Sequence, residues 1–252
     1  MTITFLGTGT SQGVPVIACG CEVCASADVR DKRLRSSIMV QGDKTVVIDS
    51  GPDFRYQMLR EHVQHLDAIV FTHEHKDHVA GLDDVRAFNY KQNSAIDVYA
   101  DERVQTALKR EFPYIFAEFK YPGIPQVKLN NISNEPFSIG DITLTPIEVM
   151  HYRLPVKGFR INDFTYITDA KTVSEAEKEK IKGSKILVIN ALQKQTHISH
   201  FTLDEAIAFA AKIGAEQTYL THISHRLGRH EDISKELPAG VELAYDGLKL
   251  EI

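Results

Sequence analysis

The stretch FTHEHKDHVAG, residues 71–81, decides the fold of this 252-residue chain. It overlaps the end of an apolar run, DAIVFT at 67–72, that has the length and composition of a strand. Side chains at a strand end can converge on one point, because a rigid sheet there gives way to an exposed loop. The stretch contains four residues of the types that bind metal ions: His73, His75, Asp77 and His78.

Three imidazoles and a carboxylate within six residues suit a borderline divalent ion such as zinc, and also iron or manganese. A chance cluster of polar surface residues is the alternative interpretation. Because one zinc takes four ligands and a hydrolase keeps positions open for water and substrate, we expect further ligands at other strand ends.

Three more side chains of this kind follow apolar runs in the same way. His151 follows ITLTPIEVM, Asp169 follows FTYIT, and His222 follows QTYLT. Taken alone, each of these residues is equally an ordinary loop residue. Together with the first motif they form one coherent set of candidate ligands.

The rest of the chain alternates short apolar runs with amphipathic helical stretches, which predicts an α/β fold of two sheets packed face to face and covered by helices. The stretch TLDEAIAFAAKIG at 202–214 predicts a helix, with Thr202 and Glu205 as a capping box and Gly214 at its end. The terminal ELAYDGLKLEI at 242–252 predicts a closing hairpin around Asp246 and Gly247.

Composition limits the class of protein. At 43% apolar residues the chain can bury a full core as one domain or two fused halves. The net charge of −5 gives no global attraction to nucleic acid. The N-terminus has no signal-peptide pattern, and no window of about 20 apolar residues occurs, so we expect a cytoplasmic protein with no membrane span.

All three cysteines lie in CGCEVC at 19–24. An odd number of cysteines in one loop argues against a disulfide framework. Cys19, Cys21 and Cys24 are therefore buried thiols, a redox site, or three of the four ligands of a zinc ion.

The segment EFPYIFAEFKYPGIP at 111–125 carries five aromatic residues and three prolines. It is interpreted as a lid, as the association surface of a homodimer, or as a packed aromatic loop.

The HxHxDH pattern after a strand, followed by the spaced His, Asp and His, resembles the metallo-β-lactamase superfamily of αββα hydrolases. The resemblance covers essentially the whole chain and implies a single hydrolase domain over residues 1–252, a four-layer sandwich built of two αβ halves. It also implies that Asp49 orients a metal-binding histidine by accepting its free N–H. It implies two divalent ions, zinc or manganese, one held by His73, His75 and His151, the other by Asp77, His78 and His222, with Asp169 bridging both.

Further motifs resemble the PhnP-like phosphoribosyl cyclic phosphodiesterase branch. These are the glycine-rich loop GTGTSQGVP, the histidine His200 before a capped helix, and CxCxxC together with a second histidine, His225. The resemblance implies a closed structural zinc site of Cys19, Cys21, Cys24 and His225, and it implies His200 and Asp77 as catalytic residues. His197 lies outside the matched pattern and is the alternative to His200, which can also have a purely structural role. The glycine-rich loop alone is equally a tight turn.

The resemblance implies a hydroxide bridging two metals that attacks a small phosphodiester, most of all a cyclic one such as phosphoribosyl 1,2-cyclic phosphate or a 2′,3′-cyclic nucleotide. His200 would protonate the leaving oxygen or stabilise the pentacoordinate phosphorus. The alternatives are an RNase Z-like nuclease, a lactone or thioester hydrolase, and a metal-bound sensor without turnover. No basic inserted arm for gripping tRNA is visible, so nucleic acid is not the expected partner.

Overall fold

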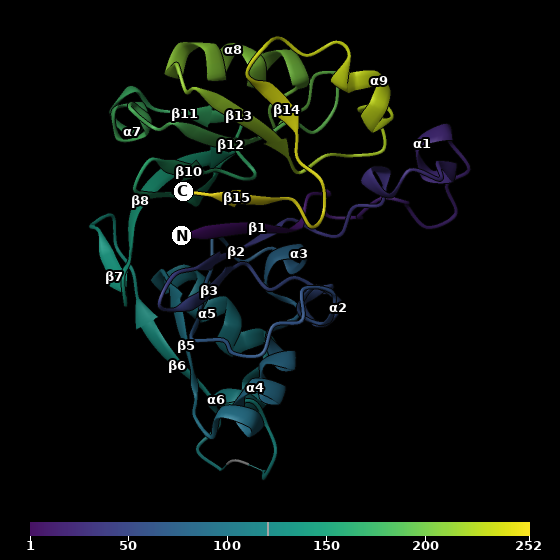
Figure 1. Cartoon of the computed structure of the whole chain (residues 1–252). Coiled ribbons are helices and arrows are strands. Elements are labelled where there is room, and N and C mark those ends of the chain that lie inside the picture. The colour runs from purple at the N-terminus through teal and green to yellow at the C-terminus, as the bar shows by residue number, and fades with distance from the viewer. Residues whose placement is uncertain (120) are drawn as a thin grey trace.

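Two β-sheets form the centre of the protein, which is represented by a computed structural model that describes residues 1–119 and 121–252. Within these residues the first sheet has seven strands in the order β15-β1-β2-β3-β4-β5-β6. The second has eight, in the order β11-β8-β9-β10-β12-β13-β14, with β7 paired to β8. Figure 1 shows β1 and β15 side by side in the middle of the molecule, with both termini beside them.

The strands of the first sheet are β1 (Thr2–Gly7), β2 (Ser37–Gln41), β3 (Thr45–Ile48), β4 (Ala68–Val70), β5 (Ile96–Ala100), β6 (Val127–Asn131) and β15 (Lys249–Glu251). Those of the second sheet are β7 (Phe137–Ile139), β8 (Ile142–His151), β9 (Leu154–Ile161), β10 (Phe164–Tyr166), β11 (Thr172–Val173), β12 (Ile186–Asn190), β13 (Gln217–Thr221) and β14 (Val241–Leu243).

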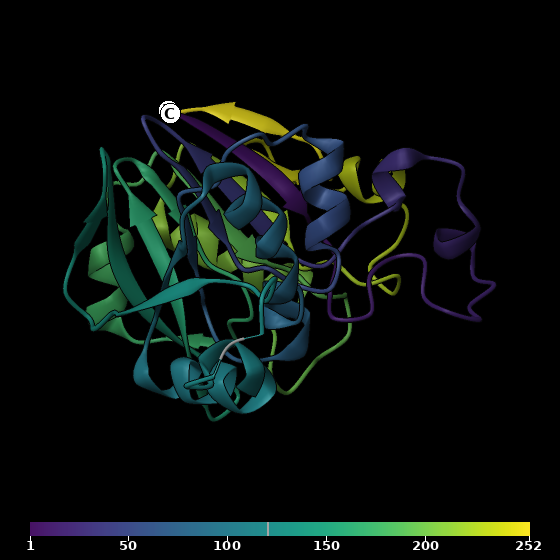
Figure 2. The same cartoon turned by 90° about the horizontal axis from the view of Figure 1, so that it is seen from below.

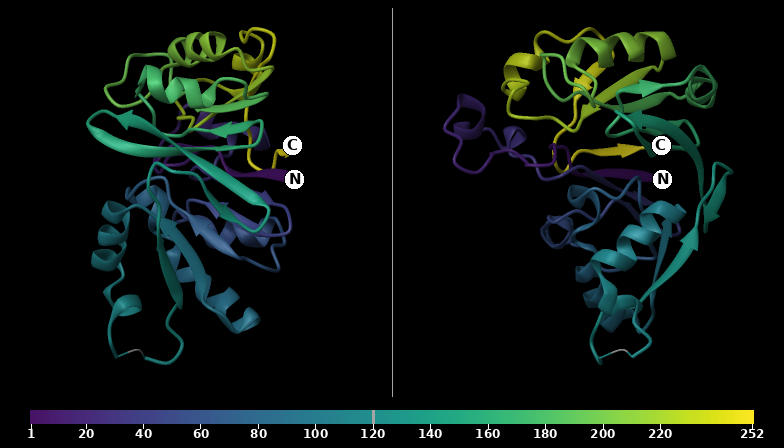
Figure 3. Two further views of the ribbon diagram at one scale, coloured as in Figure 1. Left: turned by 90° about the vertical axis from the view of Figure 1, so that its left-hand side faces the viewer. Right: turned by 180° about the vertical axis from the view of Figure 1, so that it is seen from behind.

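Helices cover the outer face of each sheet, as two views at right angles show (Figures 1 and 2). The first group is α2 (Phe54–Arg60), α3 (Lys76–Val79), α4 (Arg86–Gln92), α5 (Glu102–Glu111) and α6 (Pro113–Phe116). The second is α7 (Glu175–Ile181), α8 (Leu203–Ile213) and α9 (His230–Ser234), and α1 (Glu22–Ala25) lies on a loop that projects to one side (Figure 3). The predicted αββα sandwich is confirmed.

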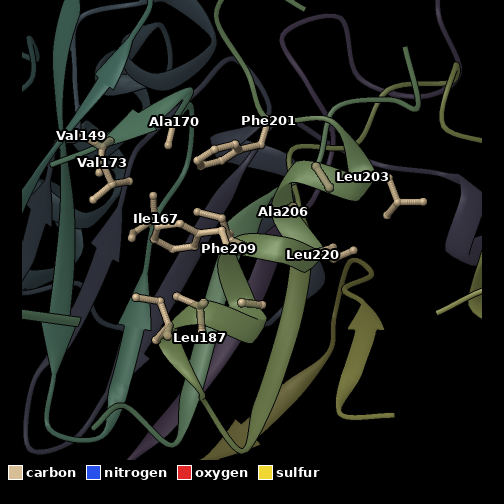
Figure 4. Close-up of a cluster of buried hydrophobic side chains, with 14 of the residues drawn as sticks. Val149, Ile167, Ala170, Val173, Leu187, Phe201, Leu203, Ala206, Phe209 and Leu220 are labelled. Carbon is tan, nitrogen blue, oxygen red and sulfur yellow. The ribbon is translucent and has the colours of Figure 1, made fainter. Parts of the chain in front are cut away.

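Three apolar clusters hold the layers together. One lies between the sheets and includes Phe5, Ile48 and Phe164. The other two lie between each sheet and its helices, and Figure 4 shows the one beneath α8, where Phe209 packs among residues of the second sheet. The predicted helix at 202–214 is confirmed as α8, with the capping box formed and Gly214 left-handed at its end.

The strand directions gather the candidate ligands at one edge of each sheet. In the first sheet β3 and β4 are parallel. In the second sheet β10, β12 and β13 are parallel, and β8 shares their direction because β9 is antiparallel to both β8 and β10. The loops that follow these strands therefore emerge on the same side of their sheet.

The predicted closing hairpin is wrong. β14 pairs in parallel with β13 in the second sheet, whereas β15 pairs antiparallel with β1 in the first. The connection is fixed by Asp246, whose carboxylate accepts hydrogen bonds from the backbone N–H groups of Thr8 and Leu34. These bonds direct the chain across to the first sheet instead of back along β14.

The aromatic segment at 111–125 is packed at its start and exposed further on. Phe112 and Ile115 are buried, whereas Phe119 and Tyr121 are largely exposed. Residue 120 lies outside the described residues. A lid or a homodimer surface stays a prediction for this segment. Separately, none of the helices in the described part of the chain has the length and apolar character needed to cross a bilayer.

A buried arginine ties the loop after β1 to α9. Arg33 donates hydrogen bonds from Nη1 to Thr8 Oγ1 at 2.8 Å and to the carbonyl oxygen of Ala244 at 2.6 Å. Its Nη2 lies 3.1 Å from His230 Nδ1. Burial and the charge of Arg33 lower the pKa of His230 to about 4, so the imidazole is neutral at pH 7 and accepts the Arg33 hydrogen bond.

Replacing His230 by glutamine is expected to weaken the acid sensitivity of folding. Because the pKa of His230 is about 4 in the folded state and ordinary in the unfolded state, the unfolded chain binds the proton first as pH falls from 6.5 to 4. As pH falls across this window, the free energy of unfolding should decrease by about 2 kcal/mol more in the wild type than in His230→Gln. Denaturant titrations at each pH measure this difference. His65→Gln, at an exposed histidine, is the control, and parallel curves for wild type and His230→Gln would contradict the assignment.

Candidate metal centre

The stretch at 71–81 folds as a strand end, a tight loop and one helical turn. β4 ends at Val70, and α3 begins at Lys76. The backbone of Gly81, at the end of the stretch, packs directly on the backbone of Gly51. A Cβ at position 81 would lie 2.2 Å from the carbonyl oxygen of Gly51, so this close approach requires glycine. This close approach places α3 directly over the loop that follows β3.

The histidines of the stretch point their ring nitrogens inward. His73 Nε2 and His75 Nδ1 lie 3.1 Å apart. The ring of His151, from the second sheet, has its centroid 6.0 Å from that of His73 and 5.2 Å from that of His75. The structure thus brings together the three residues predicted to hold one metal.

The other predicted ligands form a second, tighter group around Asp169. One ligand atom from each of Asp77, His78, Asp169 and His222 lies within 4.8 Å of all the others. Asp169 also belongs to a group with His151 and His200 that meets the same limit. Asp169 is therefore shared between neighbouring groups, as the predicted bridging role requires.

Each of four histidines in the centre has its Nδ1 within hydrogen-bond distance of an oxygen. Such partners fix the ring and its tautomer in metal sites. The pairs are His73 Nδ1 with Thr72 Oγ1 at 2.9 Å, His78 Nδ1 with Asp49 Oδ2 at 2.7 Å, His151 Nδ1 with the Ser199 carbonyl at 3.0 Å, and His222 Nδ1 with Ser36 Oγ at 3.1 Å.

Asp49 is the buried acid of this arrangement. Its carboxylate accepts hydrogen bonds from the N–H and the hydroxyl of Thr72 at 2.8 and 2.7 Å, in addition to the contact with His78. Burial raises its pKa, and the contacts with His78 and Thr72 oppose that shift. The predicted position of Asp49 behind a candidate metal-binding histidine matches the structure.

Three residues of the centre have a strained backbone. Asp49, Asp169 and His222 have φ values of 65°, 56° and 55°, in the left-handed region that non-glycine residues seldom occupy. Each residue comes directly after a strand or within three residues of one. Strain of this kind persists where the surroundings hold it and is typical of functional sites.

The donor set fits divalent metal ions. His78 Nε2 lies 3.1 Å from Asp77 Oδ2 and 3.3 Å from Asp169 Oδ2, yet it has no aligned hydrogen-bond partner among the described residues. His222 and His78 hold the pKa of Asp169 well below its usual range although burial opposes this, so the carboxylate is ionised. Zinc and manganese bind imidazole nitrogens and ionised carboxylates, so either ion would satisfy the nitrogens that lack a partner here.

His200 lies against the ligands without an orienting oxygen of its own. Its ring centroid is 4.5 Å from that of His151 and 4.9 Å from that of His222, and its Nδ1 is 3.9 Å from Asp169 Oδ1. Its side chain is buried, and Nδ1 has no hydrogen-bond partner among the described residues. Burial, and next the neighbouring His222, lower its pKa to about 3, so its imidazole is neutral at pH 7.

His197, the alternative to His200, is less buried and lies behind it. The two ring centroids are 5.1 Å apart, and His197 Nδ1 is 3.2 Å from Ser199 Oγ. His197 has no place in the ligand groups of the described residues. The structure favours His200 over His197 as the additional histidine of the centre.

The three cysteines converge on His225. The Sγ atoms of Cys19, Cys21 and Cys24 lie 3.3, 3.4 and 3.6 Å from His225 Nδ1. The Cys24 N–H and the His225 ring lower the pKa of Cys21 to about 6, whereas burial raises the pKa of Cys24 to about 11. Three sulfurs and one imidazole within 4.8 Å of one another fit a tetrahedral zinc ion.

Comparison with known proteins agrees with this geometry. Residues 44–223 match the family described as the beta-lactamase superfamily domain. The chain belongs to the metallo-β-lactamase superfamily. The predicted superfamily and fold are therefore confirmed, and the clusters of candidate metal ligands lie within this hydrolase-type fold.

Within the superfamily the chain is PhnP-like. A solved structure described as a new diphosphatase from the PhnP family is 44% identical, with a TM-score of 0.93, and the match covers 100% of this chain and 97% of that one. The octanoyltransferase of Porphyromonas gingivalis is 39% identical over 99% of this chain, which spans only 51% of that relative's length. The coenzyme PQQ synthesis protein B of Rhodopseudomonas palustris is 25% identical, over 78% of this chain and 68% of that one.

The oxygens that orient the histidines were not predicted from the sequence, apart from Asp49. Ser36 contacts His222 across a separation of 186 residues, and Ser199 contacts His151 across 48. Ser36 acts through a hydroxyl that many loop residues carry, and Ser199 acts through a backbone carbonyl that every residue has, so no sequence signal marks these two. Thr72, directly before His73, is the one partner that its position in the motif could have suggested.

Replacing Asp49 by asparagine is expected to weaken metal binding while the protein stays folded. An amide has one acceptor oxygen and an NH2 group that only donates, so asparagine cannot accept all three of the hydrogen bonds that Thr72 and His78 make to the two carboxylate oxygens, and the His78 ring is held less firmly. The affinity for zinc or manganese should fall by about 10- to 100-fold in a chelator competition assay. Asp163→Asn, on an exposed acid paired with Lys185, is the matched control, and equal affinities for both variants would contradict this role.

Replacing Cys21 by serine is expected to remove one bound metal ion per chain and leave the other metals in place. Serine does not supply the soft thiolate that completes the Cys₃His set. Metal counting by mass spectrometry should give the same loss for His225→Gln and no loss for His197→Gln. An unchanged count in Cys21→Ser would show that the cysteines are plain thiols.

Proposed function

We propose that this chain is a metal-dependent hydrolase of small phosphodiesters, using two divalent ions, zinc or manganese, and stabilised by one structural zinc. Cyclic diesters such as phosphoribosyl 1,2-cyclic phosphate and 2′,3′-cyclic nucleotides are the preferred substrates. The observation that carries the proposal is His200, a buried imidazole beside the ligand groups whose Nδ1 has no partner within the described residues.

The metal ions would be held by His73, His75 and His151, by Asp77, His78 and His222, and by Asp169 between them. When bound, such a pair lowers the pKa of water and neutralises charge on phosphate oxygens. The oxygens of Thr72, Asp49, Ser199 and Ser36 keep the imidazoles in place, so the site is formed before substrate arrives.

His200 acts as a hydrogen-bond donor to the phosphoryl group in this proposal. Two roles were expected for it, proton donation to the leaving oxygen and stabilisation of the pentacoordinate phosphorus. Its pKa of about 3 means that the neutral imidazole carries one N–H and no readily released proton at pH 7. This favours stabilisation of the phosphorus centre.

The PhnP-family diphosphatase supports chemistry at phosphorus, since it is 44% identical over nearly its whole length. Its description as a diphosphatase also favours a second candidate substrate class, compounds that contain a diphosphate group. Acyl hydrolysis is the rival, and the octanoyltransferase similarity bears on it only weakly, because this chain spans about half of that protein. A panel of diesters, diphosphate diesters, lactones and thioesters, tested on metal-loaded protein, separates these activities.

Replacing His200 by alanine is expected to lower kcat on bis(p-nitrophenyl) phosphate by about 100-fold, because one preorganised donor to the phosphoryl group is lost. Bound metal should be unchanged. His65→Ala, on an exposed histidine outside the centre, should keep wild-type kcat. Unchanged turnover in His200→Ala would contradict its role, and hydrolysis of acyl substrates alone would contradict the proposed function.

A further inference from the structure

The turn between β8 and β9 carries two large side chains beside the metal centre. β8 ends at His151 and β9 begins at Leu154, so Tyr152 and Arg153 form the turn. Tyr152 has a φ of 56°, a left-handed conformation that two-residue turns normally assign to asparagine or glycine. A bulky aromatic residue held there, next to a candidate ligand, indicates a function for the side chain rather than for the turn.

This turn borders a shallow cavity of about 460 Å³ that is open to solvent. His75 and His151 lie on its metal side, Tyr152 and Arg153 on the hairpin side, and Ile198 on the loop that leads to His200. The volume is within the range of small-molecule sites and is larger than a single phosphate group needs. The cavity therefore has room for the organic part of a substrate whose phosphorus lies at the metals.

Apart from the two histidines, the side chains that line the cavity are of other chemical types than the candidate metal ligands. Arg153 Cζ lies 5.1 Å from the centroid of the Tyr152 ring, which is a cation–π distance. Among the described residues no carboxylate forms an ion pair with Arg153. Ile198 exposes 65% of its surface, and Tyr152 exposes 51%. The cavity thus offers a positive charge, an aromatic face and an apolar side chain.

We infer that this cavity is a subsite for a nucleotide-like group, a planar base with a second phosphate, and that Tyr152 and Arg153 determine substrate specificity. The base packs on Tyr152 and Ile198, and the second phosphate pairs with the Arg153 guanidinium. The inference rests on the proposed function, because it assigns the part of the substrate that extends away from the metals.

The test measures binding of ADP and of inorganic phosphate to metal-loaded protein by isothermal titration calorimetry. In Tyr152→Asn, where asparagine tolerates the left-handed turn, and in Arg153→Gln, the Kd for ADP should rise about 10-fold. The Kd for inorganic phosphate should stay within about twofold of the wild type. Tyr56→Asn and Arg86→Gln, which remove an exposed tyrosine and an exposed arginine elsewhere on the surface, should leave both Kd values unchanged.

Two results would overturn the inference: ADP binding to the wild type no tighter than phosphate, or an ADP Kd that Tyr152→Asn and Arg153→Gln leave unchanged. The metal count should be unchanged in both variants, since neither residue is a candidate metal ligand. A lower metal count in either variant would show that the turn supports the metal centre instead. Absence of any diesterase activity in the wild type contradicts the proposed function separately, since ADP binding is measured without turnover.

Discussion

The buried carboxylate of Asp49 is the constraint on which the metal centre depends. It joins the end of β3, the end of β4 through Thr72, and α3 through His78. A carboxylate with no exposed surface is costly unless it is fully hydrogen-bonded. The three contacts offset that cost, and together they fix the loop from which the first histidines project. The left-handed backbone at Asp49, Asp169 and His222 is stable for the same reason, because each is anchored from several sides.

The two sheets contribute unequal parts to the centre. The first supplies the contiguous stretch at 71–81, and the second supplies single residues from the ends of β8, β10 and β13. The cysteine cluster adds a link from outside the sheets, because His225 lies three residues beyond His222. Ser224, between them, donates its hydroxyl to the carbonyl oxygen of Leu192 in the loop that leads to His200. A zinc ion at the cysteines would therefore stabilise the segment that carries His222 and its contact with this loop.

The sandwich and the gathering of the candidate ligands could be predicted from the sequence because their signals are local. An apolar run followed by a ligand-type residue needs no knowledge of distant partners, and α8 carried both of its capping signals in its own residues. The closing hairpin failed because Asp246 bonds to Thr8 and Leu34, more than 200 residues away. Ser36 and Ser199 were missed for the same reason. The role of Tyr152 depends on a backbone angle and a neighbouring cavity, neither of which a sequence shows.

The central claim is that these strand ends build a site for two catalytic metals, with a separate third at the cysteines. Anomalous diffraction from crystals of zinc-loaded protein tests it most directly. The account predicts three peaks per chain: one beside His73, His75 and His151, one beside Asp77, His78 and His222, and one within the cysteine cluster. The first two should both lie next to Asp169. A single peak at the histidines, or a histidine-bound peak that does not lie next to Asp169, would contradict the account.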